Sequence, residues 1–550
     1  MTTDQPATPS GGLAYKWKVL ISVIFGIFMI ILDSTVVNVA FTTLRAEYGA
    51  SLTDAQWVLS VYVLALGITT PLSGFLADRF GIKAIYLAGL LVFTASSVLC
   101  GIAPSLGVLI AARAVQGIGG GLAQPLGPAL LYRTFPLKEQ GTALGFFGIA
   151  LVLAPALGPI LGGLLVDADL WRWIFFINVP IGVTGLFIAN RFLRPEKDDR
   201  QPVLDPLGIV TSIVGFGAVL YGATIAADQG WTSPNVLLFF GIGAVALIAF
   251  AIVELFVVKE PLLDLRLYRN RTFAIASLVG YVTVIALFGA EFLMPVYLQA
   301  LRGRTALETG LLLLPLAIAS GFATPIAGRF YDKIGPRPLI VIGFLLLMVN
   351  TWQLGQIQAD TPIPWIMALL ALRGVALGMT IQTTLSTALG AVPRDKLSRG
   401  SSLINGTRFV VQSIGVAILA TVLSSALSPE VKAQSQQAQA SALPTQARFG
   451  LCETPGVAAA QNIPAAAAEQ IATLPEAARA KAIVAIRAGV QRACDENLIG
   501  FERTYQVTFV VALLAVLLGL LLPGWPGEWA GRGAPAGGKE TPAGPPPMAH

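Results

Sequence analysis

Histidine and charge are both scarce in this 550-residue chain. The single histidine, His550, is the last residue, so neither a histidine proton relay nor a histidine-based metal site is available. Charged residues make up 12% of the chain and hydrophobic residues 55%, which is far too apolar for a water-soluble globule. No Gly-x-x-x-x-Gly-Lys-[Ser/Thr] loop occurs, so we expect no ATP hydrolysis. We expect no enzyme, no cofactor and no metal site.

A basic cluster with interleaved aromatic residues is also missing, although the net charge is +6. Nucleic acid is therefore not an expected partner. The basic residues lie between long hydrophobic runs, where they set membrane topology.

The hydrophobic runs predict fourteen membrane-spanning helices. The first is too long for a signal-peptide core and lacks a clear cleavage site, so we expect it to remain as a helix. The expected spans are 17–40, 55–76, 84–103, 106–130, 141–166, 174–192, 207–226, 236–257, 272–298, 309–327, 338–357, 364–389, 402–426 and 504–523.

Lysine and arginine predict the orientation. With the amino terminus inside, 22 of the 36 basic residues face the inside, and the short outside loops carry only four. This asymmetry predicts a multi-pass protein of the inner cell membrane with both termini in the cytoplasm.

A short charged turn occurs twice between apolar helices. Gly74-Phe-Leu-Ala-Asp78-Arg79-Phe-Gly81-Ile-Lys83 recurs as Gly328-Arg-Phe-Tyr-Asp332-Lys333-Ile-Gly335-Pro-Arg337. Two copies at matching offsets indicate two related halves. The decapeptide resembles the signature of the major facilitator superfamily. The resemblance implies an all-α integral membrane protein with two six-helix bundles.

Fourteen spans leave two extra helices between the bundles. This arrangement, with Pro261–Tyr268 and Trp171–Pro180, resembles the drug:proton antiporter branch of the superfamily. The expected parts are a disordered tail 1–16, bundles 17–192 and 272–524, a linker with two helices 193–271, and a disordered tail 525–550.

Asp33 lies in the first span, in a Leu-Asp-Ser-Thr-Val-Val-Asn-Val-Ala stretch similar to a motif of that antiporter branch. An acid in hydrocarbon is costly and is a functional hypothesis by default. Since burial disfavours its charged form, Asp33 is a candidate to bind and release a proton. The alternative is an acid neutralised by a neighbouring base for structural reasons.

Arg113, in the fourth span, resembles the Arg-x-x-x-Gly motif of the superfamily. Because arginine stays charged, we expect it to tune a nearby acid, unless it only pairs with backbone carbonyls. Arg373 is its candidate counterpart in the second half.

The fifth span carries a Gly-Pro-x-x-Gly-Gly ending that resembles the motif marking antiporters; its residues are Pro155, Gly158, Pro159, Gly162 and Gly163. Small residues permit close helix packing, which alone would explain the glycines. The resemblance favours export over uptake.

The repeated turn implies a latch at the inner gate, against the alternative of an exposed charged turn. In the latch, the acid caps a helix of the opposite bundle and the bases pair across the interface. Its residues are Gly74, Asp78, Arg79, Gly81, Lys83, Asp332 and Lys333.

Glu291 is the strongest intramembrane acid of the second half. It is a candidate second proton site or attractor of cationic substrate, unless it lies near the outer surface and is solvated. Polar residues expected to line a cavity, or else to bond neighbouring helices, are Asn38, Gln116, Gln124, Gln382 and Gln412.

The outside loop 427–503 is long, and Ile483, Ile486 and Val490 mark one helical face within it. It serves either as a spacer or as a cap over the outer opening, where a periplasmic partner is one further expectation. Cys452 and Cys494 share this loop, where disulfides persist, and are predicted to pair.

These features predict a proton-coupled antiporter that exports amphipathic, cationic or neutral drugs and other small lipophilic compounds. It would work by alternating access. The alternatives are a dedicated exporter of one lipid or metabolite, and a non-transporting membrane receptor or scaffold.

Overall fold

The computed structural model describes residues 14–195, 203, 205–432, 452, 473 and 475–524, and over these residues it contains helices and no strand. Within these ranges the side chains of 42, 52, 53, 137, 227, 228, 287–292, 306 and 477 are not described. The predicted tail 525–550, nearly all of the predicted tail 1–16 and most of 433–474 lie outside the described residues.

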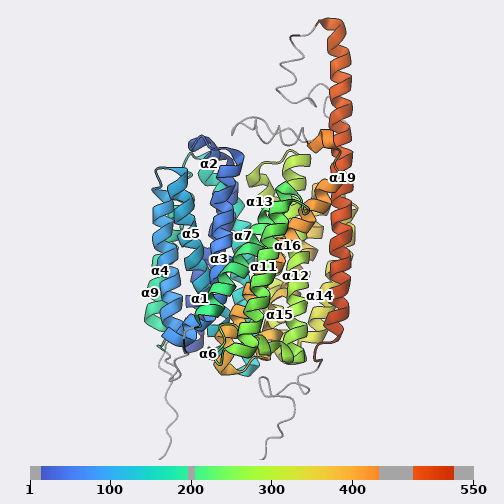
Figure 1. Ribbon diagram of the computed structural model, residues 1–550. Coiled ribbons are helices and arrows are strands. Elements are labelled where there is room, and N and C mark those ends of the chain that lie inside the picture. The colour runs from blue at the N-terminus through green and yellow to red at the C-terminus, as the bar shows by residue number, and fades with distance from the viewer. Residues whose placement is uncertain are drawn as a thin grey trace, which may run out of the picture.

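Long helices run side by side through the molecule (Figure 1). The α-helices, short ones included, are α1 (Tyr15–Val39), α2 (Phe41–Glu47), α3 (Leu52–Phe80), α4 (Ile82–Gly101), α5 (Leu106–Ala123), α6 (Leu126–Thr134), α7 (Gln140–Asp167), α8 (Trp173–Phe176), α9 (Asn178–Phe192), α10 (Pro206–Gln229), α11 (Pro234–Ile252), α12 (Arg271–Val296), α13 (Ala306–Ile334), α14 (Pro336–Gly355), α15 (Ile363–Gly390), α16 (Leu397–Ser425) and α19 (Glu476–Leu520). A π-helical turn η2 (Val253–Val257) extends α11.

The expected membrane spans are present as helices. Thirteen helical stretches within the described residues are long and apolar enough to cross a membrane. The fourteenth expected span, 272–298, corresponds to α12, which is 26 residues long and is apolar over Arg271–Ala286. An integral membrane fold follows from these helices.

The expected span 106–130 is interrupted. The chain leaves α5 at Ala123 and enters α6 at Leu126, with Gln124 and Pro125 between them. Proline cannot donate the backbone hydrogen bond that would continue the helix, so the break falls there.

The helix of the last expected span, 504–523, begins well inside the expected loop 427–503. A single 45-residue helix, α19, begins at Glu476 and continues through the membrane to Leu520. Charged residues such as Arg487 and Arg492 are too polar for a bilayer, but they do not end a helix that has left it. In Figure 1, α19 rises well beyond its neighbours.

The two ends of the molecule differ. We call the end that carries the turns after α3 and α13 the turn end, and the end from which α19 rises the disulfide end. Helices from the predicted halves meet where α3 packs on α16 and α7 packs on α13. The extra pair, α10 and α11, packs together, and α10 also contacts α3 and α16. The predicted domain boundaries remain a prediction.

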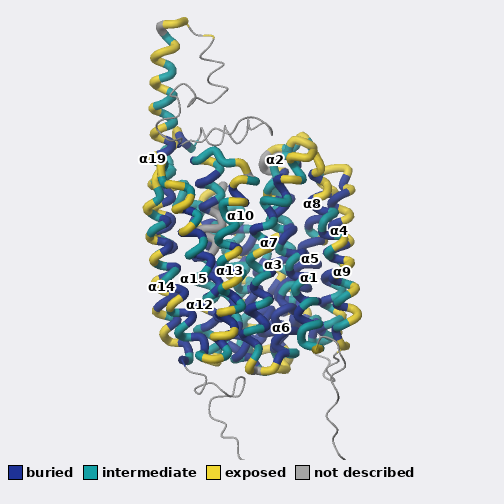
Figure 2. Tube along the Cα trace, turned by 180° about the vertical axis from the view of Figure 1, so that it is seen from behind, coloured by how far each residue is buried: buried dark blue, intermediate teal, exposed yellow. Residues whose placement is uncertain are grey.

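Large apolar side chains are exposed around the periphery, where Figure 2 shows the exposed residues. Phe187, Val245, Phe256 and Phe322 are each at least 70% exposed. In water such a surface would aggregate, whereas lipid chains solvate it. Buried residues gather between the helices, and this interior positions the polar groups described next.

Candidate proton site, cavity and latch

Asp33 is completely buried on α1, with an exposure of 0%. Its carboxylate Oδ2 accepts a hydrogen bond from Nη1 of Arg113, at 2.5 Å, and the pair forms a buried ion pair. The structure thus brings together the two residues that the sequence nominated from spans 80 positions apart.

Two amides complete the hydrogen bonds of Asp33. Oδ1 accepts from Nε2 of Gln116 at 3.0 Å and from Nδ2 of Asn178 at 2.6 Å. Gln116 also donates to Ser97 at 2.7 Å. Both oxygens of the Asp33 carboxylate therefore have hydrogen-bond donors, from one guanidinium and two amides.

Arg113 is fixed from three further directions. Its Nε donates to the carbonyl of Val58 at 3.1 Å, and Nη1 donates to Oε1 of Gln116 at 2.7 Å. Its guanidinium lies over the ring of Tyr62, 4.1 Å from the centroid. A buried charge is tolerated only with such complete pairing, so removing either partner of the ion pair is expected to be costly.

A cavity of about 190 Å³ lies next to this network, between α1, α3, α7, α13, α15 and α16. Its wall is largely apolar and includes Ile30, Leu66 and Phe409. Three of the five predicted polar residues line it, namely Gln124, Gln382 and Gln412. Apolar walls with a few polar groups are typical of small-molecule sites.

The other two predicted cavity residues lie elsewhere. Gln116 is buried against Asp33 and Ser97, because it faces the interior of the first half. Asn38 is exposed, one residue before α1 ends. Arg408, which the sequence analysis left without a role, lines the cavity.

The second half contains two candidate residues for proton coupling, Glu291 and Arg373. The side chain of Glu291, on α12, lies outside the described residues. Arg373 is fully buried; it donates to the carbonyl of Ala286 at 2.5 Å and to Thr351 at 3.2 Å.

Asp78, at the turn end of α3, contacts the opposite half. Its Oδ2 accepts from Nε of Arg399 on α16 at 2.9 Å, and its Oδ1 accepts from Nη2 of Arg133 at 3.5 Å. Arg399 also donates to Glu260 at 3.2 Å. Sequence reasoning missed Arg399 and Arg133, because each is distant from Asp78 along the chain.

Asp332, in the second copy of the turn, caps a helix of the first half. Its carboxylate accepts from the backbone amides of Gly141 at 3.0 Å and Thr142 at 2.9 Å, and from the Thr142 hydroxyl at 2.8 Å. These amides begin α7, where a negative charge is stabilising.

The bases of the turns do not pair as expected. Lys83 donates to the carbonyl of Asn190 at 2.7 Å, within its own half. Lys333 is exposed and forms no ion pair with the described residues. Arg79 lies 5.6 Å from the ring of Phe80. The positive charge that binds Asp78 from the other half is supplied by Arg399.

Two glycines of the turn have clear steric roles. A Cβ at Gly74 would lie 2.6 Å from the carbonyl oxygen of Ser398, so glycine lets α3 approach α16. Gly81 has a φ of 91°, as Gly335 has 81°, a conformation that other residues rarely adopt.

The glycine-rich end of α7 packs between α1 and α13. A Cβ at Gly158 would lie 2.2 Å from Oγ1 of Thr35, two residues beyond Asp33. Gly162 meets Val36 and Val39 in the same way, and Pro159 contacts Gly310 of α13. Pro155 lines the cavity. The motif therefore sets the distance between α1 and its neighbours.

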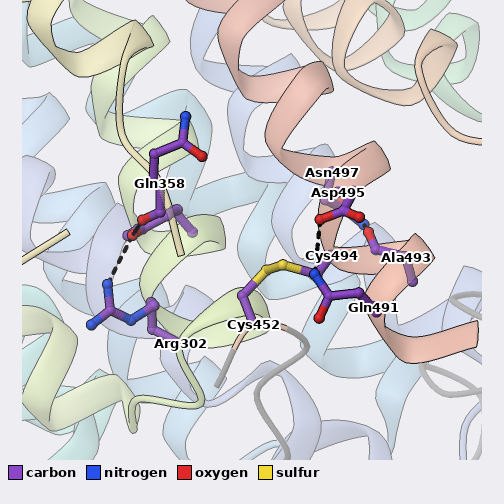
Figure 3. Close-up of a disulfide and its surroundings, with 9 residues drawn as sticks. Arg302, Gln358, Cys452, Gln491, Ala493, Cys494, Asp495 and Asn497 are labelled. Atoms are coloured by element: carbon purple, nitrogen blue, oxygen red, sulfur yellow. Dashed lines mark hydrogen bonds between the residues drawn. A yellow bond between two sulfur atoms is a disulfide. The ribbon is translucent and has the colours of Figure 1, made fainter. Parts of the chain in front are cut away.

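At the disulfide end, Cys452 is bonded to Cys494 of α19, with their Cα atoms 5.2 Å apart (Figure 3). The amide of Cys452 donates to the carbonyl of Leu301 at 2.7 Å. The bond therefore ties α19 to the segment that follows α12. Cys100 is a buried free thiol beside Gln116.

Comparison with known sequences identifies the family of the chain independently of the site geometry. The profile described as Major Facilitator Superfamily matches residues 23–416. YhcA of Bacillus subtilis (strain 168), named an uncharacterized MFS-type transporter, is 37% identical over 405 residues, or 74% of this chain and 76% of that one. The multidrug export protein EmrB of Haemophilus influenzae is 33% identical over 71% of this chain and 77% of its own. A multidrug resistance protein B homolog of Mycobacterium tuberculosis is 32% identical over 71% of this chain and 73% of its own.

Solved structures show the same fold at low identity. A proton:xylose symporter, XylE, superposes with a TM-score of 0.57 at 15% identity, covering 93% of this chain and 96% of its own. The human organic anion transporter MFSD10 superposes with a TM-score of 0.56 at 14% identity, covering 94% of this chain and 100% of its own.

Proposed function

Because the chain belongs to the Major Facilitator Superfamily, whose members are transporters, we propose that it is a proton-coupled antiporter exporting amphipathic drugs or other small lipophilic compounds. Several relatives carry multidrug resistance or export names, which supports export of such compounds.

The observation that carries the proposal is the shared wall between the buried ion pair and the cavity. Asp33 is flanked on α1 by Ile30 and Ser34, which line the cavity. Arg113 lies against the ring of Tyr62, which lines the cavity from the other side. A substrate that moves Tyr62 would therefore disturb the ion pair, and a proton on Asp33 would release Arg113. Such competition couples the two fluxes.

The turn end would face the cytoplasm, because lysine and arginine are concentrated there. Asp78 and Asp332 each join one half to the other at that end, and these contacts would form the inner latch in its engaged state. Alternating access would require both contacts to break as the two bundles, 17–192 and 272–524, rock about the cavity.

The test is efflux of a fluorescent lipophilic cation or neutral dye from energised vesicles. Asp33→Asn should abolish gradient-driven flux, because asparagine accepts hydrogen bonds but cannot release a proton at working pH. Asp360→Asn, at an exposed acid of the disulfide end, is the matched control and should transport normally.

Full gradient-driven efflux in Asp33→Asn would place the coupling group elsewhere, with Glu291 the next candidate. Dye binding without any gradient-dependent flux in the unmodified protein would favour a receptor or scaffold. Flux inhibited by one compound alone, out of a varied panel, would favour a dedicated exporter of a single lipid or metabolite.

A further inference from the structure

Two buried carboxylates lie together outside the proton site and the cavity, at the turn end of the extra helices. Asp205 precedes α10 and is 3% exposed, and Glu254 lies in η2, after α11, and is 1% exposed. Charged groups are rarely buried without a partner, so this arrangement requires an explanation.

The two carboxylates face each other across Gly208. A Cβ at Gly208 would lie 2.0 Å from Oδ2 of Asp205 and 2.7 Å from Oε1 of Glu254. The two oxygens are therefore within about 5 Å of each other, close enough for like charges to oppose ionisation. Oδ1 of Asp205 accepts from the amide of Gly208 at 2.8 Å, so the first carboxylate also caps α10.

Three oxygens of the pair lack a hydrogen bond. They are Oδ2 of Asp205 and both oxygens of Glu254. The amides of Leu262 and Leu263 point toward Glu254, but they do not reach hydrogen-bonding geometry. Neither acid forms an ion pair within the described residues. One proton between the two acids would remove the repulsion and supply a donor to the unpaired oxygens.

Arg399 connects this pair to the latch. It holds Asp78 and Glu260, and its charge also acts on Glu254. Two charged side chains of the segment after η2 have other partners: Asp264 binds Lys396 at 2.6 Å, and Arg266 donates to the carbonyl of Leu255 at 3.0 Å. A change of charge on the pair therefore acts on the same guanidinium that binds Asp78.

We propose that Asp205 and Glu254 form a second proton-binding site, which shares one proton and biases the inner latch through Arg399. With the proton bound, Arg399 is left to Asp78 and the latch holds. When the proton leaves, the second negative charge draws Arg399 away and the carboxylates repel each other, which weakens the contact between α3 and α16. The link to gating rests on the proposed latch, whereas the proton site stands without it.

Infrared spectroscopy of the full chain in lipid nanodiscs tests the proton site. The protein should show the C=O band of a buried carboxylic acid that disappears as pH rises, and Glu254→Gln should lack it. Asp205→Asn keeps the helix cap but removes the neighbouring charge, so the band should persist and titrate at lower pH. Asp360→Asn, at an exposed acid of the disulfide end, is the control and should leave the band unchanged.

A reporter cysteine tests the link to the latch. Ser386 is buried on α15, and its carbonyl accepts from the hydroxyl of Tyr132 across the turn end. We expect Ser386→Cys to react with an impermeant maleimide only when that end opens. The ratio of labelling rates with and without Glu254→Gln cancels the thiol's own pH dependence. The ratio should be near one at acid pH and fall about fivefold or more at alkaline pH.

Each readout can overturn the proposal. An unchanged spectrum in Glu254→Gln would exclude the proton site, and an unchanged titration in Asp205→Asn would exclude sharing. A labelling ratio that stays flat with pH would exclude the link to the latch. Loss of drug efflux in the unmodified protein would refute the antiport proposal and leave the infrared result standing. If Glu254→Gln does not fold, the shift in Asp205→Asn decides the question alone.

Discussion

Asp332→Asn is the sharpest test of the latch, since Asp332 holds the first turn of α7 by three hydrogen bonds. Asparagine keeps one acceptor oxygen but loses the charge and places an amide group against the α7 donors. Charge-assisted hydrogen bonds are worth roughly 1.5–3 kcal/mol each, and a charge at a helix terminus up to about 2 kcal/mol. The remaining oxygen of asparagine still accepts a hydrogen bond and recovers part of this stabilisation. We therefore expect the free energy that favours the closed state to fall by about 2 kcal/mol.

A loss of about 2 kcal/mol corresponds to roughly a thirtyfold shift toward the state that is open at the turn end. The assay is maleimide labelling of Ser386→Cys from the turn end, which should accelerate by a similar factor. The parent protein, whose Cys100 is buried, should not react. Lys333→Gln changes the neighbouring exposed side chain and is the matched control.

An unchanged labelling rate in Asp332→Asn would refute the reasoning, because it would mean that the cap does not hold the closed state. Equal acceleration in Lys333→Gln would have the same consequence, since it would point to a general effect of charge at this turn. Faster labelling in Asp332→Asn alone would support a latch.

Three further outcomes are expected. Asp33→Glu keeps the proton but displaces it by about one methylene, so vesicle efflux should fall about tenfold without vanishing. Cys452 and Cys494 should resist thiol reagents until reduced, and Cys494→Ser should lower stability toward thermal unfolding, since the bond closes a loop of 42 residues worth about 4 kcal/mol in chain entropy. Gly158→Ala should force Thr35 away and destabilise the protein by about 1–3 kcal/mol, whereas Gly241→Ala, which meets nothing within 4 Å, should not. Thermal aggregation measured by fluorescence-detected chromatography checks the last two.

The local sequence pattern alone was sufficient to predict the membrane spans, because each crossing of a bilayer requires about 20 consecutive apolar residues. The glycines of the turn are a second case. Gly81 and Gly335 have positive φ, which a sequence motif can preserve because the constraint belongs to the residue itself. The pairing of Cys452 with Cys494 is a third, since they are the two cysteines of the expected outside loop 427–503.

Local pattern failed where a property depends on several segments. Asn178 donates a hydrogen bond to Asp33. It lies in the stretch Trp171–Pro180 that resembled the antiporter branch, but nothing in the sequence indicated that its side chain faces α1. Gln116 was assigned to the cavity because periodicity shows that a residue is buried, not which neighbour it faces. The helical continuation of α19 was missed because polarity ends a membrane span without ending a helix.

The sequence by itself determined that this is an integral membrane protein with an acid in its first span, because hydrophobic length and a charge in hydrocarbon are read one segment at a time, and the resemblance of the repeated turn to a superfamily signature pointed to a transporter. Only the tertiary structure decided which groups meet. Arg399 reaches Asp78 from 321 positions away, and Glu254 faces Asp205 across Gly208. Electrostatic interactions between such groups depend on distances of a few ångströms, and these distances are set by how the helices pack.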